Sequence, residues 1–239
     1  MSKKGLNTIQ IAGLDLVSST EKQVLNFIGS RISNRVKTLV VTPNPEFIVF
    51  AEKNPYFKAL LKKADLAVPD GVGLVLASWF LPGSMIKQRI TGSSLVEALL
   101  EMAGKKGWRV GIVGARGGVG EERKELMKRL QARFKGAKVV ALEDEVGWEK
   151  RTFELIFACQ GMGKQEKWLA DHLRGSQGLL YMGVGGSLDF LTGFAKRAPV
   201  VVQNLGLEWL WRLVSRPRRH FRRVWVACVV FPGLIFRRR

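Results

Sequence analysis

Residues 108–120 read WRVGIVGARGGVG, and this stretch decides the fold class. The first half, through Val113, is a short apolar run that predicts a buried strand, and a charged helix is expected to follow the glycines to about Phe134. Glycines at such a junction let the backbone approach a diphosphate, and the helix N-terminus attracts its charge. The stretch therefore predicts a strand–loop–helix unit that either binds a nucleotide or makes a simple tight turn.

The same alternation extends along most of the chain. Further short apolar runs predict buried strands at 39–41, 66–68, 138–142, 155–159 and 179–184. Between them lie helical patterns at 20–33, which starts with a capping-box pattern, and at 47–64 (with a break near Asn54), 72–81 and 94–106. Short apolar strands that alternate with helices are typical of a parallel sheet with helices on both faces. We therefore expect a Rossmann-like α/β fold.

The composition is that of a globular protein. The chain has 239 residues, of which 46% are hydrophobic and 25% charged, and this excludes a disordered or fibrous chain. Two cysteines, Cys159 and Cys228, are too few for a disulfide framework, so we expect the protein to work in a reducing cytosol. The two histidines, His172 and His220, are isolated in the sequence and form no metal-binding motif with the cysteines, so we expect no metal. No signal peptide is expected, and the longest apolar run, 224–236, is shorter than the roughly 20 residues of a membrane-spanning helix.

Positive charge accumulates at the C-terminal end. Lys and Arg outnumber Asp and Glu by 39 to 20, a net charge of +19. No acidic residue follows Glu208, although nine arginines do. A protein with such a charge is expected to have anionic partners. We place a boundary near Gln203, between a main α/β domain (1–203) and a basic helical appendage (204–239).

The appendage has the pattern of an amphipathic helix. Two sets of side chains fall on two of its faces: Arg218, Arg219, Arg222 and Arg223 on one, and Phe221, Val224, Trp225 and Cys228 on the other. An arginine-rich face beside an apolar one is typical of a helix that lies on an anionic membrane surface. A helix that packs its apolar side on the main domain stays open as an alternative. The apolar run argues against a nucleic-acid partner.

Polar side chains follow several predicted strands. Asn44 precedes a proline, and Asp70 lies in the sequence VPDG. The simplest interpretation of Asn44 is a helix cap, and that of Asp70 is a structural turn. Asp70, however, also follows a predicted parallel strand, and a general base is expected at the carboxyl end of such a strand. A second glycine cluster, at 183–187, leads to Asp189, and two such backbone nests suggest a site for a phosphorylated ligand.

A series of short motifs recurs in a fixed order along the chain. They are TxNxE at 42–46, PDGxG at 69–73, RxTGS at 89–93, GxxKQExW at 161–168, GVGGSxDF at 183–190, KRAP at 196–199, GLEW at 206–209 and RLxxxPxRxxR at 212–222. This order closely resembles the WecG/TagA/CpsF family of bacterial glycosyltransferases, and the resemblance covers the chain from about residue 8 to 225.

The resemblance implies an inverting hexosyltransferase of cell-envelope polysaccharide or teichoic acid synthesis. Such an enzyme moves an N-acetylhexosamine-type sugar, commonly N-acetylmannosamine, from a UDP donor to N-acetylglucosamine on a polyprenyl diphosphate. It uses no cofactor and no metal, which agrees with the absence of an Asp-x-Asp sequence here. The appendage would close the site and touch the anionic membrane. The protein would thus be a peripheral protein on the cytoplasmic face of the plasma membrane. Assembly into a homo-oligomer is left open.

The resemblance also implies roles for particular residues. Asp70 would be the general base, and Arg212, Arg219 and Arg222 would reach the site. The residues expected to bind substrate are Thr42, Asn44, Arg89, Thr91, Gly92, Ser93, Gly114, Gly117, Gln165, Glu166, Gly185, Gly186 and Asp189.

The chain departs from the family pattern in three places. Gly163 stands where the family usually has proline, Ser94 replaces a common aspartate, and the segment 148–161 is shorter than usual. These differences bear on loop rigidity, donor contacts and oligomer packing.

Two other functions compete with the transferase. One is a nucleotide-binding oxidoreductase, although no acidic residue occurs at 132–136, where a dinucleotide fingerprint would place it. The other is a non-enzymatic basic protein that binds membrane surfaces.

Overall fold

The structure is a computed structural model that describes residues 5–82, 85–199, 201–202, 206–215 and 217–237, except for the side chains of Arg212, Ser215, Pro217, Arg219 and His220. The strands are β1 (Thr8–Ile11), β2 (Leu14–Val17), β3 (Thr38–Val41), β4 (Leu66–Ala67), β5 (Arg109–Val113), β6 (Lys138–Ala141), β7 (Phe153–Ala158) and β8 (Gly178–Gly183). The α-helices are α1 (Glu21–Ser33), α2 (Pro45–Lys53), α3 (Pro55–Lys62), α4 (Val72–Trp79), α5 (Gly92–Lys106), α6 (Glu121–Arg133), α7 (Lys164–Gly175), α8 (Ser187–Leu191), α10 (Glu208–Ser215), α11 (Pro217–Trp225) and α12 (Phe231–Phe236). Short 3-10 turns form η1 (Ala115–Gly117), η2 (Leu142–Asp144) and η3 (Trp148–Lys150), and η4 (Val226–Val230) is π-helical.

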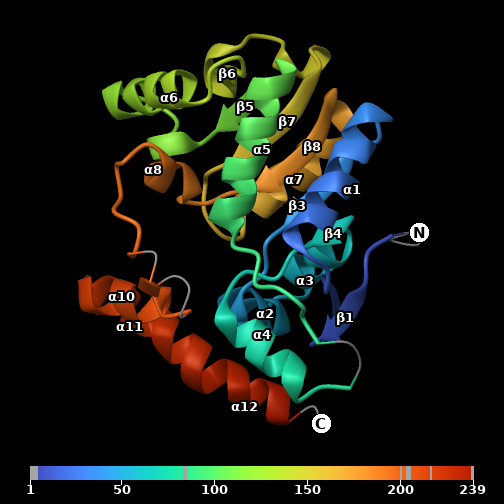
Figure 1. Cartoon of the computed structure of the whole chain (residues 1–239), viewed down its shortest axis with the longest axis vertical. Helices are drawn as coiled ribbons and strands as arrows, with labels where there is room; N and C mark the ends of the chain where they lie inside the picture. Colours follow the sequence, from blue (N-terminus) through green and yellow to red (C-terminus); the bar gives the residue numbers. More distant parts are fainter. Residues whose placement is uncertain (1–4, 83–84, 200, 203–205, 216, 238–239) are drawn as a thin grey trace.

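Six strands form one parallel sheet in the order β4–β3–β8–β7–β5–β6 (Figure 1). The chain moves outward from β3 to β4 on one side and from β5 to β6 on the other, and β8 and β7 fill the centre. Ligands of such sheets bind outside the carboxyl ends of the strands, where the strand order reverses. The predicted α/β fold class is confirmed, and each predicted strand is present.

Side chains of the strands alternate between two apolar layers, one on each face of the sheet. In β3, Val40 packs in the layer formed with α1, α5 and α6, whereas Leu39 and Val41 pack in the layer formed with α2, α3 and α7. All six residues of β8 are buried. Burial on both faces is the physical reason why the strands have continuous apolar sequences.

Local signals set the ends of the first helices. Thr20 and Gln23 form the capping box of α1, as predicted. Asn54 accepts a hydrogen bond from the amide of Phe57 and so caps α3, with Pro55 at the first helical position. The chain therefore breaks between α2 and α3 at the predicted place.

An antiparallel hairpin, β1–β2, precedes the sheet and was not predicted from the sequence. Its turn, Ala12–Gly13, has positive φ at both residues, 51° and 78°, as a two-residue hairpin turn requires. Ile9, Ile11 and Leu16 are buried in the same layer as α2 and α3. The hairpin thus extends the core beyond the large sheet.

The C-terminal helices lie against the main body of the protein. η4 and α12 pack on α2, and Phe231 and Ile235 belong to the core layer on that side of the sheet. Part of the surface of the apolar run 224–236 therefore packs on the protein, which is the alternative that the sequence left open for the appendage. The expected domain boundary near Gln203 falls on residues 203–205, which lie outside the described residues.

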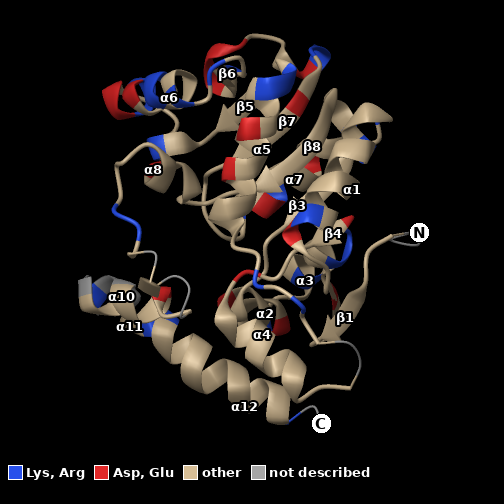
Figure 2. Ribbon diagram, in the orientation of Figure 1, with Lys and Arg blue, Asp and Glu red and all other residues tan. Residues whose placement is uncertain are grey.

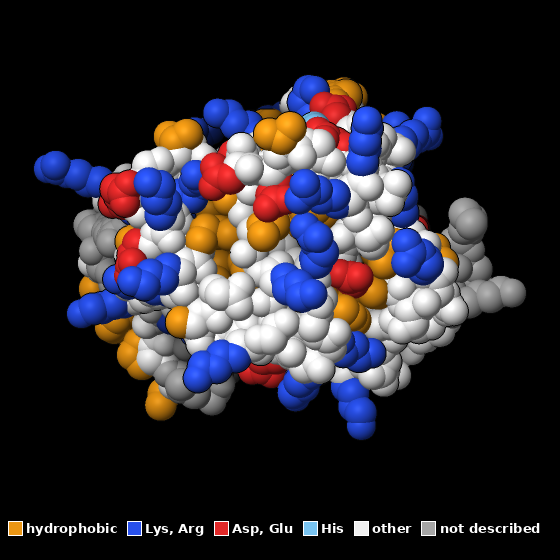
Figure 3. Space-filling view, turned by 90° about the horizontal axis from the view of Figure 1, so that it is seen from above, with side chains coloured by type: hydrophobic (Ala, Val, Ile, Leu, Met, Phe, Trp, Pro, Cys, Tyr) orange, Lys and Arg blue, Asp and Glu red, His pale blue; other side chains and the backbone are white. Residues whose placement is uncertain are grey.

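Charge is unevenly distributed along these helices. No charged residue occurs between Arg223 and Arg237, so the stretch from η4 to α12 is uncharged in Figure 2. On the face seen from above, basic side chains are scattered over the surface with acidic side chains between them (Figure 3). Within the described ranges, no helix has the length and apolarity that a bilayer span requires.

Candidate active site

The carboxyl ends of β3 and β4 carry the first group of predicted site residues. Thr42 and Asn44 follow β3, and Asp70 follows β4. The amide nitrogen of Asp70 donates a hydrogen bond of 2.8 Å to the carbonyl of Pro43. Parallel pairing therefore continues beyond the strands and brings these side chains to one edge of the sheet.

A cavity of about 480 Å³ opens beside this edge, a size typical of small-molecule sites. Asn44, Asp70 and Arg89 line its polar end. The rest of its wall comes from the start of α2, from α4 with the residues next to it, and from the C-terminal helices. Three of the predicted site residues therefore share one cavity.

Asp70 is oriented by the start of α5. The amide nitrogen of Gly92 donates a hydrogen bond of 3.2 Å to Asp70 Oδ2. A Cβ on Gly92 would lie 3.2 Å from that oxygen and 3.4 Å from Thr42 Oγ1, so the close approach depends on glycine. The positive end of a helix dipole stabilises a carboxylate placed there.

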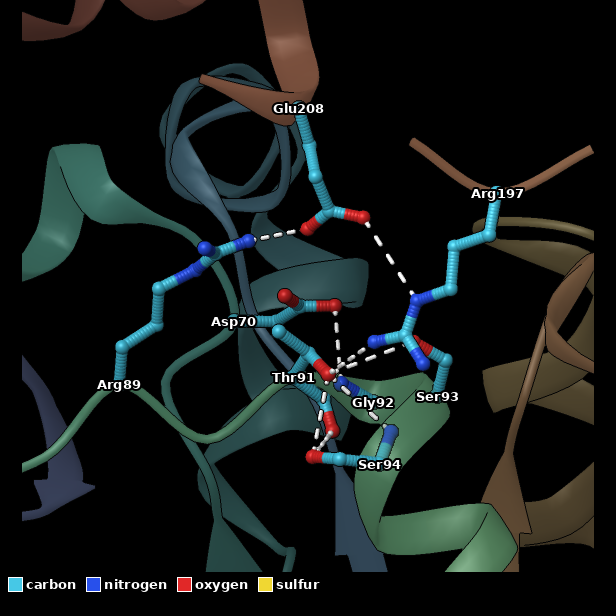
Figure 4. A network of polar contacts seen from close by, with 8 residues as sticks. All are labelled: Asp70, Arg89, Thr91, Gly92, Ser93, Ser94, Arg197 and Glu208. Atoms are coloured by element: carbon cyan, nitrogen blue, oxygen red, sulfur yellow. Dashed lines mark hydrogen bonds and ion pairs between the residues drawn. The ribbon is translucent and has the colours of Figure 1, made fainter. Parts of the chain in front are cut away.

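Charged side chains from distant parts of the chain meet above Asp70 (Figure 4). Arg89 forms an ion pair with Glu208, the first residue of α10, and the Nε atom of Arg197 lies 3.9 Å from the other carboxylate oxygen of Glu208. Arg197 also donates a hydrogen bond of 3.3 Å to Thr91 Oγ1. This network connects the start of α10 to the loop before α5, at the polar end of the cavity.

Several predicted binding residues also cap helices. Asn44 accepts a hydrogen bond from the amide of Phe47 and caps α2, yet it lines the cavity as well. Thr91 caps α5 by accepting a hydrogen bond of 3.1 Å from the amide of Ser94. The Ser94 hydroxyl donates to the carbonyl of Thr91, and Ser93 Oγ lies 3.3 Å from Thr91 Oγ1. Ser94, a departure from the family pattern, therefore acts locally in the cap.

The two glycine-rich loops form a second group at the same edge of the sheet. Gly114 and Gly117 have positive φ, 72° and 84°, after β5. The amide of Gly114 donates a hydrogen bond of 2.6 Å to Glu143, which follows β6. Arg116 Nη1 lies 3.6 Å from Asp189, which connects this loop to the first turn of α8. Neither loop lines the cavity that holds Asp70.

Gln165 and Glu166 are buried rather than open to that cavity. Gln165 accepts a hydrogen bond of 3.0 Å from the amide of Gly185, and its amide group donates to Glu166. Burial raises the pKa of Glu166 above its ordinary value, although the hydrogen bonds from Gln165 and Gly163 act in the opposite direction. Both side chains support the loop after β8, whose Gly186 is exposed.

Gly163 has a conformation that proline cannot adopt. Its φ is 86°, and its amide donates a hydrogen bond of 2.6 Å to Glu166 Oε2. Proline has a fixed negative φ and no amide hydrogen. The departure from the family pattern at this position therefore has a defined structural consequence.

The expected arginines of the appendage are only partly placed. The side chains of Arg212 and Arg219 lie outside the described residues. Arg222 is exposed and does not line the cavity, whereas its neighbour Arg223 does and lies 3.6 Å from Glu46. Among the described residues, no group of three or more His, Cys, Asp or Glu side chains could hold a metal ion.

Arg197, Glu208 and Arg223 were not predicted as site residues. The first two lie in two of the ordered motifs, KRAP and GLEW, so membership of these motifs was an available signal. For Arg223 the helical pattern indicated only an arginine-rich face and not which residue turns toward the cavity.

The fold and the site define a Rossmann-like α/β protein with its candidate active site at the carboxyl edge of the parallel sheet. The chain belongs to the glycosyl transferase WecG/TagA/CpsF family, whose family model matches residues 9–239. It is therefore a glycosyltransferase of cell-envelope polysaccharide synthesis, with a nucleotide-sugar donor and a lipid-linked acceptor. This membership favours the transferase over the oxidoreductase and the non-enzymatic membrane-binding protein.

Proposed function

We propose that the protein transfers an N-acetylhexosamine from UDP to N-acetylglucosamine on a polyprenyl diphosphate. The sugar that we expect is N-acetylmannosamine. The reaction inverts the anomeric centre and needs no metal ion. The observation that carries this proposal is the position of Asp70, a carboxylate that lines the cavity at the carboxyl edge of the sheet.

Asp70 is the general base of the proposed reaction. An acceptor hydroxyl is a weak nucleophile at neutral pH, and a positioned base raises its reactivity. The hydroxyl oxygen attacks the anomeric carbon, its proton passes to Asp70, and the bond from that carbon to UDP breaks. A single displacement of this kind inverts the configuration. The hydrogen bond from Gly92 fixes the orientation of the carboxylate.

Cationic side chains and backbone amides would stabilise the charge on the departing UDP. Arginine suits this role because its guanidinium group binds phosphate oxygens in a bidentate manner. Arg89 lines the cavity, and Arg212, Arg219 and Arg222 are the further candidates from the family pattern. The glycine loops at 114–118 and 185–186 offer amides for the diphosphate.

The appendage, residues 204–239, would also hold the enzyme on the cytoplasmic face of the plasma membrane. Phe221 and Trp225 of α11 are 64% and 54% exposed, and Arg218 and Arg222 are exposed on the same helix. Exposed aromatic and basic side chains together favour an anionic lipid surface. Analytical ultracentrifugation of the full chain measures whether copies of it assemble into a homo-oligomer in solution.

Product analysis with a panel of UDP-sugars tests the proposal. The purified full chain is incubated with N-acetylglucosamine on a short polyprenyl diphosphate, with and without a chelator, and the product's anomeric configuration is determined by NMR. We expect transfer from UDP-N-acetylmannosamine, inversion, and no effect of the chelator. Retention of configuration, or transfer only from other donors, would contradict the proposal.

Flotation with vesicles tests the membrane part separately. We expect the protein to float with vesicles that contain phosphatidylglycerol and to be released as salt is raised, because screening weakens the attraction. Binding to neutral vesicles with equal strength at all salt concentrations would contradict the electrostatic part.

A further inference from the structure

The cavity beside Asp70 changes character along its length. Its polar end holds Asp70, Arg89 and Glu208, and its other end is lined by large apolar side chains such as Leu76, Phe80 and Phe236. A uracil ring and a sugar ring have only short apolar faces, so a nucleotide sugar alone does not require an apolar extension of this length.

One wall of the cavity is a continuous helical stripe. From Arg223 to Phe236 the lining residues recur in pairs at every fourth position, as the side chains on one face of a helix do. The stripe is roughly 20 Å long at 1.5 Å per residue. Arg223 is its single charged member and stands at the end near Glu46, from which it lies 3.6 Å.

The facing wall is α4, which begins beside Asp70. Its lining residues follow the same helical spacing, from Val72 and Gly73 through Leu76 to Phe80. At the far end, the rings of Phe80 and Phe236 lie 6.2 Å apart, so the two walls meet there. Both walls therefore run from a polar end at Asp70 to an apolar end at the same pair of aromatic rings.

The apolar end is open to the outside. The side chains of Leu76, Phe80 and Phe236 are 43%, 49% and 57% exposed. Large apolar side chains that remain exposed around a groove mark a binding surface. The helix is also widened to a π-turn at η4, directly before Phe231, and such turns are frequent at functional sites.

We propose that this apolar extension binds the hydrocarbon tail of the lipid-linked acceptor, with the diphosphate near Arg223 and the terminal sugar at Asp70. The inference rests on the proposed acceptor. The polarity of the two walls matches an amphiphile of this order: a polar sugar, then an anionic diphosphate, then an isoprenoid chain. A phospholipid such as phosphatidylglycerol has no sugar to fill the end at Asp70, so the acceptor is the occupant to which we commit.

Cys228 is a natural reporter of this extension. It lines the cavity and is exposed, whereas burial raises the pKa of the other thiol, Cys159, well above its ordinary value and suppresses its reaction. Maleimide labelling of the full chain, read by peptide mass spectrometry, therefore reports on Cys228. Farnesyl diphosphate at a concentration of about ten times its Kd should slow this labelling roughly tenfold. Inorganic diphosphate should leave the labelling rate unchanged.

Kinetics on the full chain give the second measurement. With N-acetylglucosamine on methyl, geranyl and farnesyl diphosphate, KM should fall at least about tenfold from the methyl to the geranyl ester, because buried methylene groups contribute additively. Ala227→Trp fills the apolar extension and should abolish this dependence without changing UDP affinity. Val229→Trp is the matched control, because Val229 is 48% exposed and does not line the cavity.

The outcomes separate this inference from the proposed function. Labelling unaffected by farnesyl diphosphate, protection by phosphatidylglycerol vesicles alone, or a dependence on tail length that persists in Ala227→Trp would each overturn the inference. Protection of Cys228 by farnesyl diphosphate with no transfer to any ester would support the tail site and overturn the proposed transfer. Should Ala227→Trp not fold, the labelling of the unmodified chain still decides.

Discussion

The backbone amide of Gly92 donates a hydrogen bond to the carboxylate of Asp70, with 3.2 Å between the nitrogen and Oδ2. Asp70 follows β4 and Gly92 is the first residue of α5, so the contact joins two elements at the edge of the sheet. It fixes the carboxylate in the cavity. The role that we assign to Asp70 depends on this position, and the first two predictions concern it.

Replacing Asp70 by Asn should leave the protein folded and reduce turnover by about 10²- to 10⁴-fold, the usual contribution of a general base. The side-chain oxygen of Asn can still accept the hydrogen bond from Gly92, so the geometry is kept while the basic group is lost. Turnover is measured by product formation and UDP affinity by calorimetry. Asp171→Asn is the control, because Asp171 is exposed on α7 and pairs only with Lys167 among the ion pairs described. Near-wild-type turnover of the Asp70 variant would exclude the role.

Gly92→Ala should reduce turnover while the melting temperature changes little. The added Cβ would lie 3.2 Å from Asp70 Oδ2 and displace the carboxylate, and a misplacement of about 1 Å can cost roughly 10²-fold in rate. Alanine itself suits the start of α5, since Gly92 does not need a positive φ. Gly175→Ala provides the control, because a Cβ there meets no atom within 4 Å. Unchanged turnover in Gly92→Ala would show that the position of Asp70 is not critical.

Much of the fold could be predicted because its signals are local. The strands of a parallel sheet are buried on both faces and so have continuous apolar sequences, as in β5 and β8. Asn44, Asn54 and Thr91 cap helices through bonds to residues three positions away, which a sequence pattern can indicate. The β1–β2 hairpin escaped prediction because its turn, Ala12–Gly13, is not one of the common turn dipeptides.

The site could be predicted from the sequence only where its residues directly follow predicted strands. Asp70 and Asn44 follow strands, and a parallel sheet brings such positions together. The pairing of Arg89 with Glu208 joins residues 119 positions apart, and no local pattern encodes it. Gln165 and Glu166 are buried, because the packing of α7 on the sheet turns them toward the loop after β8, and their role in substrate binding stays a prediction.

Gly163→Pro should lower stability markedly, and Gly163→Ala should lower it less. Proline removes the amide that binds the buried Glu166, which costs about 1–3 kcal/mol for an unsatisfied group, and it cannot adopt a φ of 86°. Alanine keeps the amide and adds only the backbone strain of φ 86° and ψ −49°, about 1–3 kcal/mol. Chemical denaturation measures both variants. A proline variant as stable as the wild type would mean that the backbone at this position is not held by Glu166.

The raised pKa of Glu166 predicts how stability depends on pH. Between the ordinary value of 4.5 and the higher value in the folded protein, the unfolded chain loses its proton while the folded chain keeps it. The folded state then binds more protons, so stability falls as pH rises through this window. Glu166→Gln removes the effect. The melting temperature of the wild type minus that of the variant should therefore be greatest below pH 4.5 and decrease above it.

Thermal denaturation over a pH series gives this difference directly. Glu101→Gln, at an exposed position of α5, corrects for the general loss of one carboxylate. A difference that grows as pH rises would mean that the folded protein favours the ionised form of Glu166, contrary to the effect of its burial.

The ion pair between Arg89 and Glu208 should contribute more to stability than a surface pair. Their side chains are only 21% and 11% exposed, and the pair attaches the start of α10 to the loop before α5. Because each residue makes other contacts, a double-mutant cycle of Arg89→Met and Glu208→Gln is needed to isolate the pair, and we expect a coupling energy of about 0.5–3 kcal/mol. Glu208→Gln alone should lower the free energy of unfolding more than Arg89→Met does, since Arg197 also faces Glu208, at 3.9 Å.

The control cycle uses Lys167 and Asp171, which are 58% and 50% exposed and should couple by only about 0.3–0.5 kcal/mol. Denaturant titrations of all variants supply the energies. If the two cycles give equal coupling, the pair does not hold the C-terminal helices on the protein, and their attachment must come from the apolar packing of Phe231 and Ile235 instead.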